Sequence, residues 1–152
     1  MSKTDIIAEF FIAKAEVDDV EITNLKLQEL LYCSQGMVLA KLGESLLDEY
    51  IIVGDYGPEV PSVQKIANKY TYNPIIIEAP LDKIKRINEF GKGIEEILND
   101  IWCMFGTLSV WELNEMIFQE IPWQKALKRR DKIISNDDLG RCFKSYLKKD
   151  DI

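Results

Sequence analysis

The chain has 152 residues and a net charge of −7 at neutral pH, with 47% hydrophobic and 30% charged residues. These values are ordinary for a globular protein, so disordered and collagen-like classes are excluded, and we expect one domain over residues 1–152. The longest apolar stretches, residues 75–77 and 101–105, are far shorter than the roughly 20 residues that a membrane-spanning helix needs.

The first 43 residues carry the start and stop signals of two helices. Ser2 or Thr4 can cap a helix whose apolar residues recur at helical spacing and which ends in the acidic run at residues 16–21. Thr23 is an N-cap for a second helix over residues 24–42, and Gly43 favours the left-handed conformation that ends helices. Because apolar residues cover two faces of this second helix, we expect it to be central and packed on more than one side.

Residues 50–77 predict two short strands on either side of a helix. The β-branched and aromatic residues at 50–58 and 73–77 are typical of strands. Pro61 suits the first turn of a helix over residues 61–70, because proline is best tolerated there. We expect the two strands to pair into a small ribbon on a helical body.

The stretch DYGPEVPS, residues 55–62, places Gly57, Pro58 and Pro61 within five residues. In the structural interpretation it is a tight turn, in which Gly57 supplies a positive φ and Pro58 fixes the next residue. In the functional interpretation this stiff turn presents a preordered edge to a partner, which lowers the entropic cost of binding. The two interpretations are compatible.

The second half of the chain predicts helices with clear boundaries. Residues 81–105 have helical apolar spacing with a bend or break near residues 91–93. Ser109 and Glu112 have the spacing of a capping box, and the helix that they start stops near residue 120, ahead of a proline.

A short helix follows that proline, and Ser135 can cap the last helix of the chain. The predicted fold class is therefore mainly α: a compact helical domain of about six to seven helices with a small two-stranded β element. Among the tryptophans, we expect Trp102 and Trp123 to lie in the core. Trp111 lies in a first helical turn beside an acidic residue, and it is the best candidate for an exposed anchor.

The sequence contains no histidine, which removes Ser–His and Cys–His nucleophile activation and nearly all zinc hydrolase sites. Clustered carboxylate motifs and glycine-rich phosphate loops are also absent. We therefore predict no enzyme, no catalytic residue, no metal ligand and no cofactor, with a carboxylate-based hydrolase as the opposing hypothesis. The three widely spaced cysteines are expected to be free thiols, and with an acidic N-terminus they indicate a cytoplasmic protein.

The charge is distributed unevenly along the chain. Residues 1–60 carry four basic and twelve acidic side chains, whereas residues 121–152 carry nine basic and five acidic ones. We therefore expect the molecule to have an acidic side, formed by the N-terminal segment, and a basic one. The acidic side suits a basic protein partner, and the net negative charge of the chain disfavours binding to nucleic acid. The run KALKRRDK at residues 125–132 is either a solvated helix end or a local patch for nucleic acid or an acidic protein surface.

Four sequence blocks occur in an order that resembles a known family. They are ITNLKLQELLYCSQGMVLAKLGESLLDE at residues 22–49, YGPEVPSV at 56–63, FGTLSVWELNEMIFQEIPWQKA at 105–126 and ISNDDLGRCF at 134–143. Together they resemble the Panacea domain, also described as GepA-like or SocA-like.

The resemblance implies a mostly helical antitoxin domain that neutralises a toxin by direct contact, without a catalytic site. Relatives occur in bacterial and phage toxin–antitoxin pairs and in mobile elements, and some are implicated in handing a bound toxin to a protease. The chain departs from the family pattern at Gln119, where a histidine is common, and at Asp55 and Glu59, which flank YGP.

The leading hypothesis is therefore an antitoxin-like protein-binding module in a bacterial or phage toxin–antitoxin system, with a cognate toxin, expected to be basic, and a protease as partners. The alternatives are a nucleic-acid-associated regulator and a phage or mobile-element anti-defence inhibitor. The predicted partner-binding residues lie in the turn and on adjoining helical segments: Asp55, Tyr56, Gly57, Pro58, Glu59, Pro61, Trp111, Gln119, Glu120 and Trp123.

Overall fold

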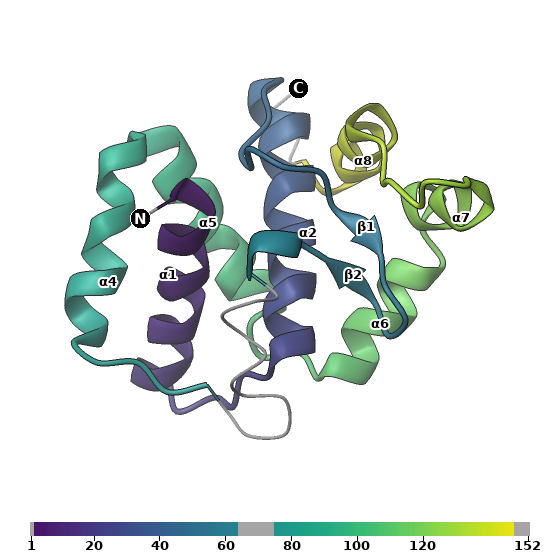
Figure 1. The fold of residues 1–152 in the computed structure, drawn as a ribbon. Coiled ribbons are helices and arrows are strands. Elements are labelled where there is room, and N and C mark those ends of the chain that lie inside the picture. The colour runs from purple at the N-terminus through teal and green to yellow at the C-terminus, as the bar shows by residue number, and fades with distance from the viewer. Residues whose placement is uncertain (1, 64–74, 148–152) are drawn as a thin grey trace.

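Helix α2 (Asn24–Leu42) runs through the centre of the computed structural model, which describes residues 2–63 and 75–147 (Figure 1). Its ends are those that the sequence predicts. The Thr23 hydroxyl accepts a hydrogen bond from the Lys26 backbone N–H, and Gly43 ends the helix with a φ of 72°. Every residue from 26 to 38 is buried, which confirms that α2 is packed on more than one side.

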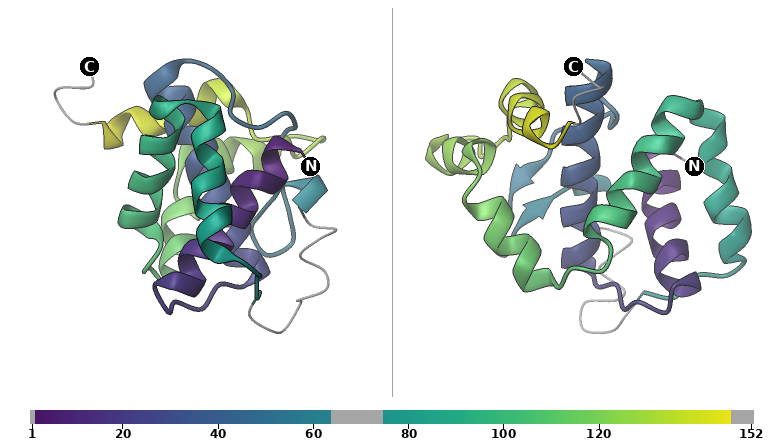
Figure 2. Two further views of the ribbon diagram at one scale, coloured as in Figure 1. Left: turned by 90° about the vertical axis from the view of Figure 1, so that its left-hand side faces the viewer. Right: turned by 180° about the vertical axis from the view of Figure 1, so that it is seen from behind.

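One side of α2 is covered by α1 (Lys3–Val17) and α5 (Lys92–Phe105), and α4 (Pro80–Arg86) packs against α1 (Figure 2). A 3₁₀ turn, η2 (Ile87–Phe90), joins α4 to α5 and ends at Gly91, which has a φ of 95°. The predicted break near residues 91–93 is therefore confirmed, because this backbone conformation suits glycine and interrupts the helix.

The other side of α2 is covered by α6 (Val110–Phe118), α8 (Asn136–Phe143) and the 3₁₀ turn η3 (Lys144–Tyr146), and α7 (Ile121–Lys128) packs against α8 (Figure 2). The predicted capping box is present at the start of α6, and Ser135 caps α8 as expected. These local signals lie within four residues of each other, so they act whatever the rest of the chain does.

The β element is a hairpin of β1 (Ile52–Val53) and β2 (Pro58–Glu59). The predicted pairing of residues 50–58 with residues 73–77 is wrong, because residues 75–77 form no strand and residues 73–74 lie outside the described part. The nearer segment pairs instead, since a short turn closes at low entropic cost. The Ile75 backbone N–H donates to the Ile22 carbonyl at 3.1 Å.

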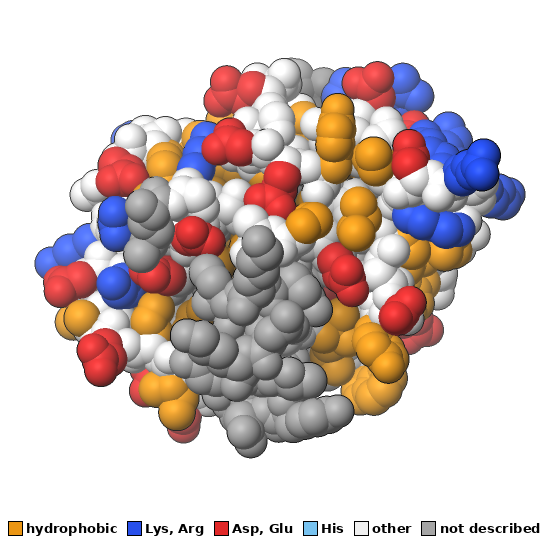
Figure 3. All heavy atoms as spheres, viewed as in Figure 1, with side chains coloured by type: hydrophobic (Ala, Val, Ile, Leu, Met, Phe, Trp, Pro, Cys, Tyr) orange, Lys and Arg blue, Asp and Glu red, His pale blue; other side chains and the backbone are white. Residues whose placement is uncertain are grey.

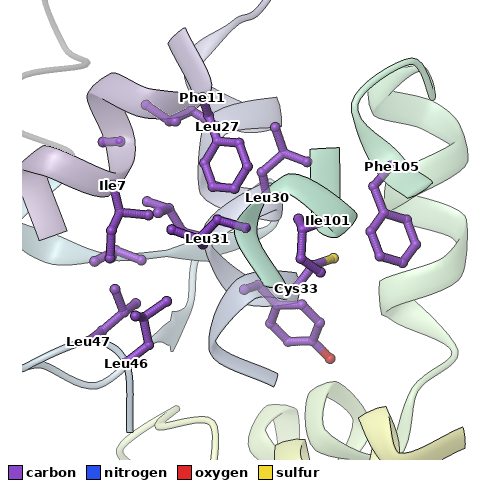
Figure 4. Close-up of a cluster of buried hydrophobic side chains, with 14 of the residues drawn as sticks. Ile7, Phe11, Leu27, Leu30, Leu31, Cys33, Leu46, Leu47, Ile101 and Phe105 are labelled. Atoms are coloured by element: carbon purple, nitrogen blue, oxygen red, sulfur yellow. The ribbon is translucent and has the colours of Figure 1, made fainter. Parts of the chain in front are cut away.

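The hydrophobic core surrounds α2. Side chains from α1, α2 and α5 point toward one another in it (Figure 4), and they include Ile7, Phe11, Leu27, Leu30, Leu31, Ile101 and Phe105. Trp102 and Trp123 are buried and Trp111 is exposed, as predicted. A mainly α fold with a small two-stranded element is thus confirmed.

Two further predictions concern the helix after the hairpin and membrane-spanning helices. In the predicted helix over residues 61–70, residues 61–63 are helical and residues 64–70 lie outside the described part. Within residues 2–63 and 75–147, none of the helices combines the length and the apolarity that crossing a bilayer requires.

Candidate functional site

The β1–β2 hairpin ends in a two-residue turn made by Asp55 and Tyr56. The pairing of Val53 with Pro58 leaves residues 54–57 between the strands, and the Gly54 N–H donates to the Gly57 carbonyl at 2.9 Å, which leaves Asp55 and Tyr56 at the tip. Both turn residues are exposed, and 79% of the Tyr56 surface is accessible to solvent. An aromatic ring therefore projects from the tip of a tightly closed turn.

Gly57 packs closely against side chains of two helices. The expected positive φ at Gly57 is wrong, because among the glycines only Gly43 and Gly91 have one. Instead, a Cβ on Gly57 would lie 2.7 Å from Leu25 Cδ1 on α2 and 3.5 Å from Asn114 Oδ1 on α6. Glycine lets the hairpin backbone approach both helices.

A Gly57→Ala variant is expected to lower the free energy of unfolding by about 1 kcal/mol, because the added methyl group forces the end of the Leu25 side chain to move. Urea denaturation measures the change. Gly93→Ala is the matched control, since its Cβ would meet only Leu42 side-chain atoms at 3.9 Å. Equal stabilities for the two variants would contradict the close packing at Gly57.

The base of the hairpin is held by hydrogen bonds from distant parts of the chain. The Gln28 side chain on α2 accepts from the Val60 backbone N–H at 2.7 Å, and the Glu49 carboxylate accepts from the Ser62 backbone N–H at 2.8 Å. On the outer side of β1, the Val53 N–H donates to the Lys132 carbonyl at 2.9 Å. These bonds hold the turn in a fixed position, so little entropy remains to be lost when it binds.

Helix α6 places Trp111 beside this hairpin. Asn114 packs under Gly57, and Trp111 lies three residues earlier, on the same face of α6. Trp111 is 77% exposed. Figure 3 shows hydrophobic side chains gathered at the lower right, over the hairpin turn and α6. We call the surface formed by Asp55, Tyr56, Glu59 and Trp111 the hairpin–α6 surface.

The remaining predicted residues do not all face outward. Gly57 and Pro58 are buried beneath the turn, whereas Pro61 and Gln119 are exposed. Trp123 is buried, with its ring centroid 4.8 Å from that of Phe118. These positions make Gly57, Pro58 and Trp123 parts of the scaffold that supports the surface.

Glu120 is also directed toward the interior. Its carboxylate accepts hydrogen bonds from the hydroxyls of Tyr32 at 2.9 Å and Tyr146 at 3.2 Å. Burial raises the pKa of Glu120, although these hydrogen bonds partly oppose the shift. Glu120 thus links α2, α7 and η3, and it is not part of the hairpin–α6 surface.

Sequence reasoning missed Gln28 and Asn114, which position the hairpin. Asn114 Oδ1 is buried and has no hydrogen-bond partner among the described residues. The signal for Gln28 was present, because a helix that is apolar on two faces also buries the polar residues between them. Asn114 carries no such signal, since its burial depends on contact with the hairpin.

The described residues contain no group of three or more Cys, Asp and Glu side chains arranged to hold a metal ion. The features of the site are instead an exposed aromatic pair, two acidic side chains and a rigid turn. Such a surface is suited to contact with another protein.

Comparison with known proteins identifies the family. A family model described as "Antitoxin SocA-like, Panacea domain" matches residues 27–124. These residues include most of α2, the hairpin, α6 and the start of α7. Searches of curated proteins and of solved structures found no significant match. Because the family model covers more than half of the sequence, the chain belongs to the SocA-like antitoxin family with a Panacea domain.

Proposed function

We propose that the protein neutralises a cognate toxin by binding it through the hairpin–α6 surface. Membership of an antitoxin family supports the role. The observation that carries the choice of surface is the pair of exposed aromatic residues, Tyr56 and Trp111, on a hairpin and a helix that are packed together. Tyrosine and tryptophan supply most of the binding energy at many protein interfaces, especially where the backbone is already ordered.

The charges of the same surface suggest the chemistry of the toxin. Asp55 and Glu59 flank the YGP stretch, and the chain as a whole carries a charge of −7. Acidic side chains around an aromatic centre favour a partner with a basic contact region, and they accelerate encounter at low ionic strength. The inhibition requires no bond to be made or broken in the toxin, so the proposal includes no enzymatic activity. It places the complex in the cytoplasm of a bacterial or phage-infected cell.

Co-expression with the product of the neighbouring reading frame tests this function. We expect that product alone to stop growth, and the wild-type chain to restore growth and co-purify with it. In the Tyr56→Ala/Trp111→Ala variant, binding is expected to weaken by at least about 100-fold, because each ring contributes on the order of 2 kcal/mol or more at a hot spot. Calorimetry measures the dissociation constants.

Leu81→Ala is the matched control, because Leu81 is 63% exposed and lies on α4, on the opposite side of α2 (Figure 1). It should bind as the wild type does. Circular dichroism establishes that each variant is folded. A harmless neighbouring product, rescue without binding, or equal binding by the aromatic variant and the control would each contradict the proposal.

The basic segment at residues 125–132 favours one alternative, a nucleic-acid-associated regulator. That function predicts that the protein shifts the electrophoretic mobility of duplex DNA. The binding should weaken steeply as the salt concentration is raised, since contacts with phosphates release counterions. If a variant of residues 125–132 lost this DNA binding while the Tyr56→Ala/Trp111→Ala variant kept it, the regulator function would be favoured.

A further inference from the structure

A second surface feature lies between α7 and α8. A pocket of about 420 Å³ opens there, lined by Ile121, Lys125, Asp138, Arg141 and Cys142. It shares no residue with the hairpin–α6 surface. Ile121 is 62% exposed and Cys142 is half-buried, so the pocket combines apolar groups with cationic ones.

The pocket has an excess of positive charge. Asp138 is buried, and its carboxylate forms ion pairs with Lys125 at 3.5 Å and Arg129 at 3.1 Å. One carboxylate is thus shared by two cations. Arg141 is exposed, and no carboxylate in the described part of the chain lies within ion-pair distance of it.

The region around the pocket is also more basic than acidic. Residues 120–147 contain seven lysine and arginine residues and four aspartate and glutamate residues, although the chain is acidic as a whole. One of the four is Glu120, whose carboxylate is hydrogen-bonded to the Cys142 thiol. Figure 3 shows basic side chains gathered at the upper right, over α7 and the segment that follows it. Exposed residues of that region include Lys128, Arg130 and Lys132.

From this combination we propose that the α7–α8 pocket binds a short acidic peptide segment of another protein, with one apolar side chain seated between Ile121 and Cys142. The carboxylates of the segment lie against Arg141 and Lys125. Arginine forms bidentate hydrogen bonds with carboxylates, and the apolar seat adds the burial that a purely ionic contact lacks.

The chemistry of the pocket favours a peptide over nucleic acid. The exposed large aromatic residues of the described chain are Tyr50, Tyr56 and Trp111, and none belongs to α7 or α8. Nucleotide bases therefore have no ring to stack on, whereas an aliphatic side chain can use Ile121. The pocket and the hairpin–α6 surface share no residue, so the two binding sites can be tested by separate variants.

Fluorescence anisotropy with a labelled twelve-residue peptide tests the pocket. The probe has one central leucine flanked by aspartate and glutamate, and a matched probe has serine in place of the leucine. We expect the leucine peptide to bind at least about tenfold more tightly than the serine peptide, and its affinity to fall as salt is raised. Labelled single-stranded DNA with the same number of charges should bind more weakly than the leucine peptide.

Two variants assign the binding to these residues. Arg141→Glu should weaken leucine-peptide binding at least tenfold, and Ile121→Ser should remove the difference between the two peptides. Lys85→Glu, an equal charge change at an exposed position on α4, is the control and should retain most of the affinity. Absence of peptide binding, equal effects of Arg141→Glu and Lys85→Glu, or tighter binding of DNA would overturn the proposal.

Discussion

The Glu29→Gln variant is expected to be more stable than the wild type by about 2–5 kcal/mol at pH 8.5, and to differ little from it at pH 4. Glu29 lies on α2 and is 0% exposed. Neither of its carboxylate oxygens has a hydrogen-bond partner among the described residues. An ionised carboxylate in such a position loses its hydration without compensation.

The direction of the pH dependence follows from the pKa of Glu29. Burial raises this pKa from an ordinary 4.5 to about 8, against the attraction of the nearby Lys26 ammonium. Between these two pH values the folded protein keeps the proton and the unfolded chain releases it. The stability of the wild type is therefore full below pH 4.5 and is lost as the pH rises toward 8, whereas glutamine remains neutral throughout.

Urea denaturation at intervals from pH 4 to pH 8.5 measures this effect as the difference between the two stability curves. Glu115→Gln on α6 is the control, because Glu115 is exposed and its replacement should leave the curve of the wild type unchanged. Glu29→Met provides a second neutral side chain without an amide, and it should also flatten the curve. Parallel curves for the wild type and both Glu29 variants would show that this carboxyl group does not control the stability.

The second large effect is expected at Glu120, whose replacement by alanine should lower the free energy of unfolding by about 2–4 kcal/mol. The Tyr32 and Tyr146 hydroxyls both donate to this carboxylate, and Tyr32 is fully buried. Without Glu120 the Tyr32 hydroxyl is left unsatisfied in the interior, and the connection between α2 and η3 is lost.

Thermal and urea denaturation of two further variants separate a structural role of Glu120 from a role in binding. Glu120→Gln keeps an acceptor for at least one hydroxyl, so it should cost less than Glu120→Ala. Gln119→Ala changes the exposed neighbouring residue and should stay within about 0.5 kcal/mol of the wild type. If Glu120→Ala kept its stability but lost the toxin, Glu120 would be a contact residue as the sequence analysis expected.

The sequence predicted the helices well because their signals are local. Thr23 and Gly43 bound α2, and Ser109 and Glu112 start α6, in each case through backbone groups within a few residues. The exposed position of Trp111 could also be predicted, since it lies in a first helical turn outside the apolar register. The order of the four blocks indicated the family, which the family model confirms.

The candidate site was only partly predictable, because its residues are assembled by contacts between distant parts of the chain. The sequence placed Glu120 among the partner-binding residues, and the structure directs its carboxylate toward the Tyr32 and Tyr146 hydroxyls. Trp123, which the sequence assigned both to the core and to the partner-binding set, is buried. Glu120 accepts from Tyr32, which lies 88 residues away, and this pairing cannot be read from either segment alone. The reason for Gly57 is likewise tertiary, since the hairpin approaches α6, a helix more than 50 residues later.

By itself the sequence determined most helix boundaries, the mainly α class and the presence of a turn at residues 55–58, since local hydrogen bonds and the turn-forming residues set these features. Only the tertiary structure decided that β1 pairs with β2, that the turn lies against α6, and that Glu29 is buried without a partner. The physical reason is that strand pairing and burial depend on which surfaces meet when the chain folds around α2. The sequence order of a segment does not determine those neighbours.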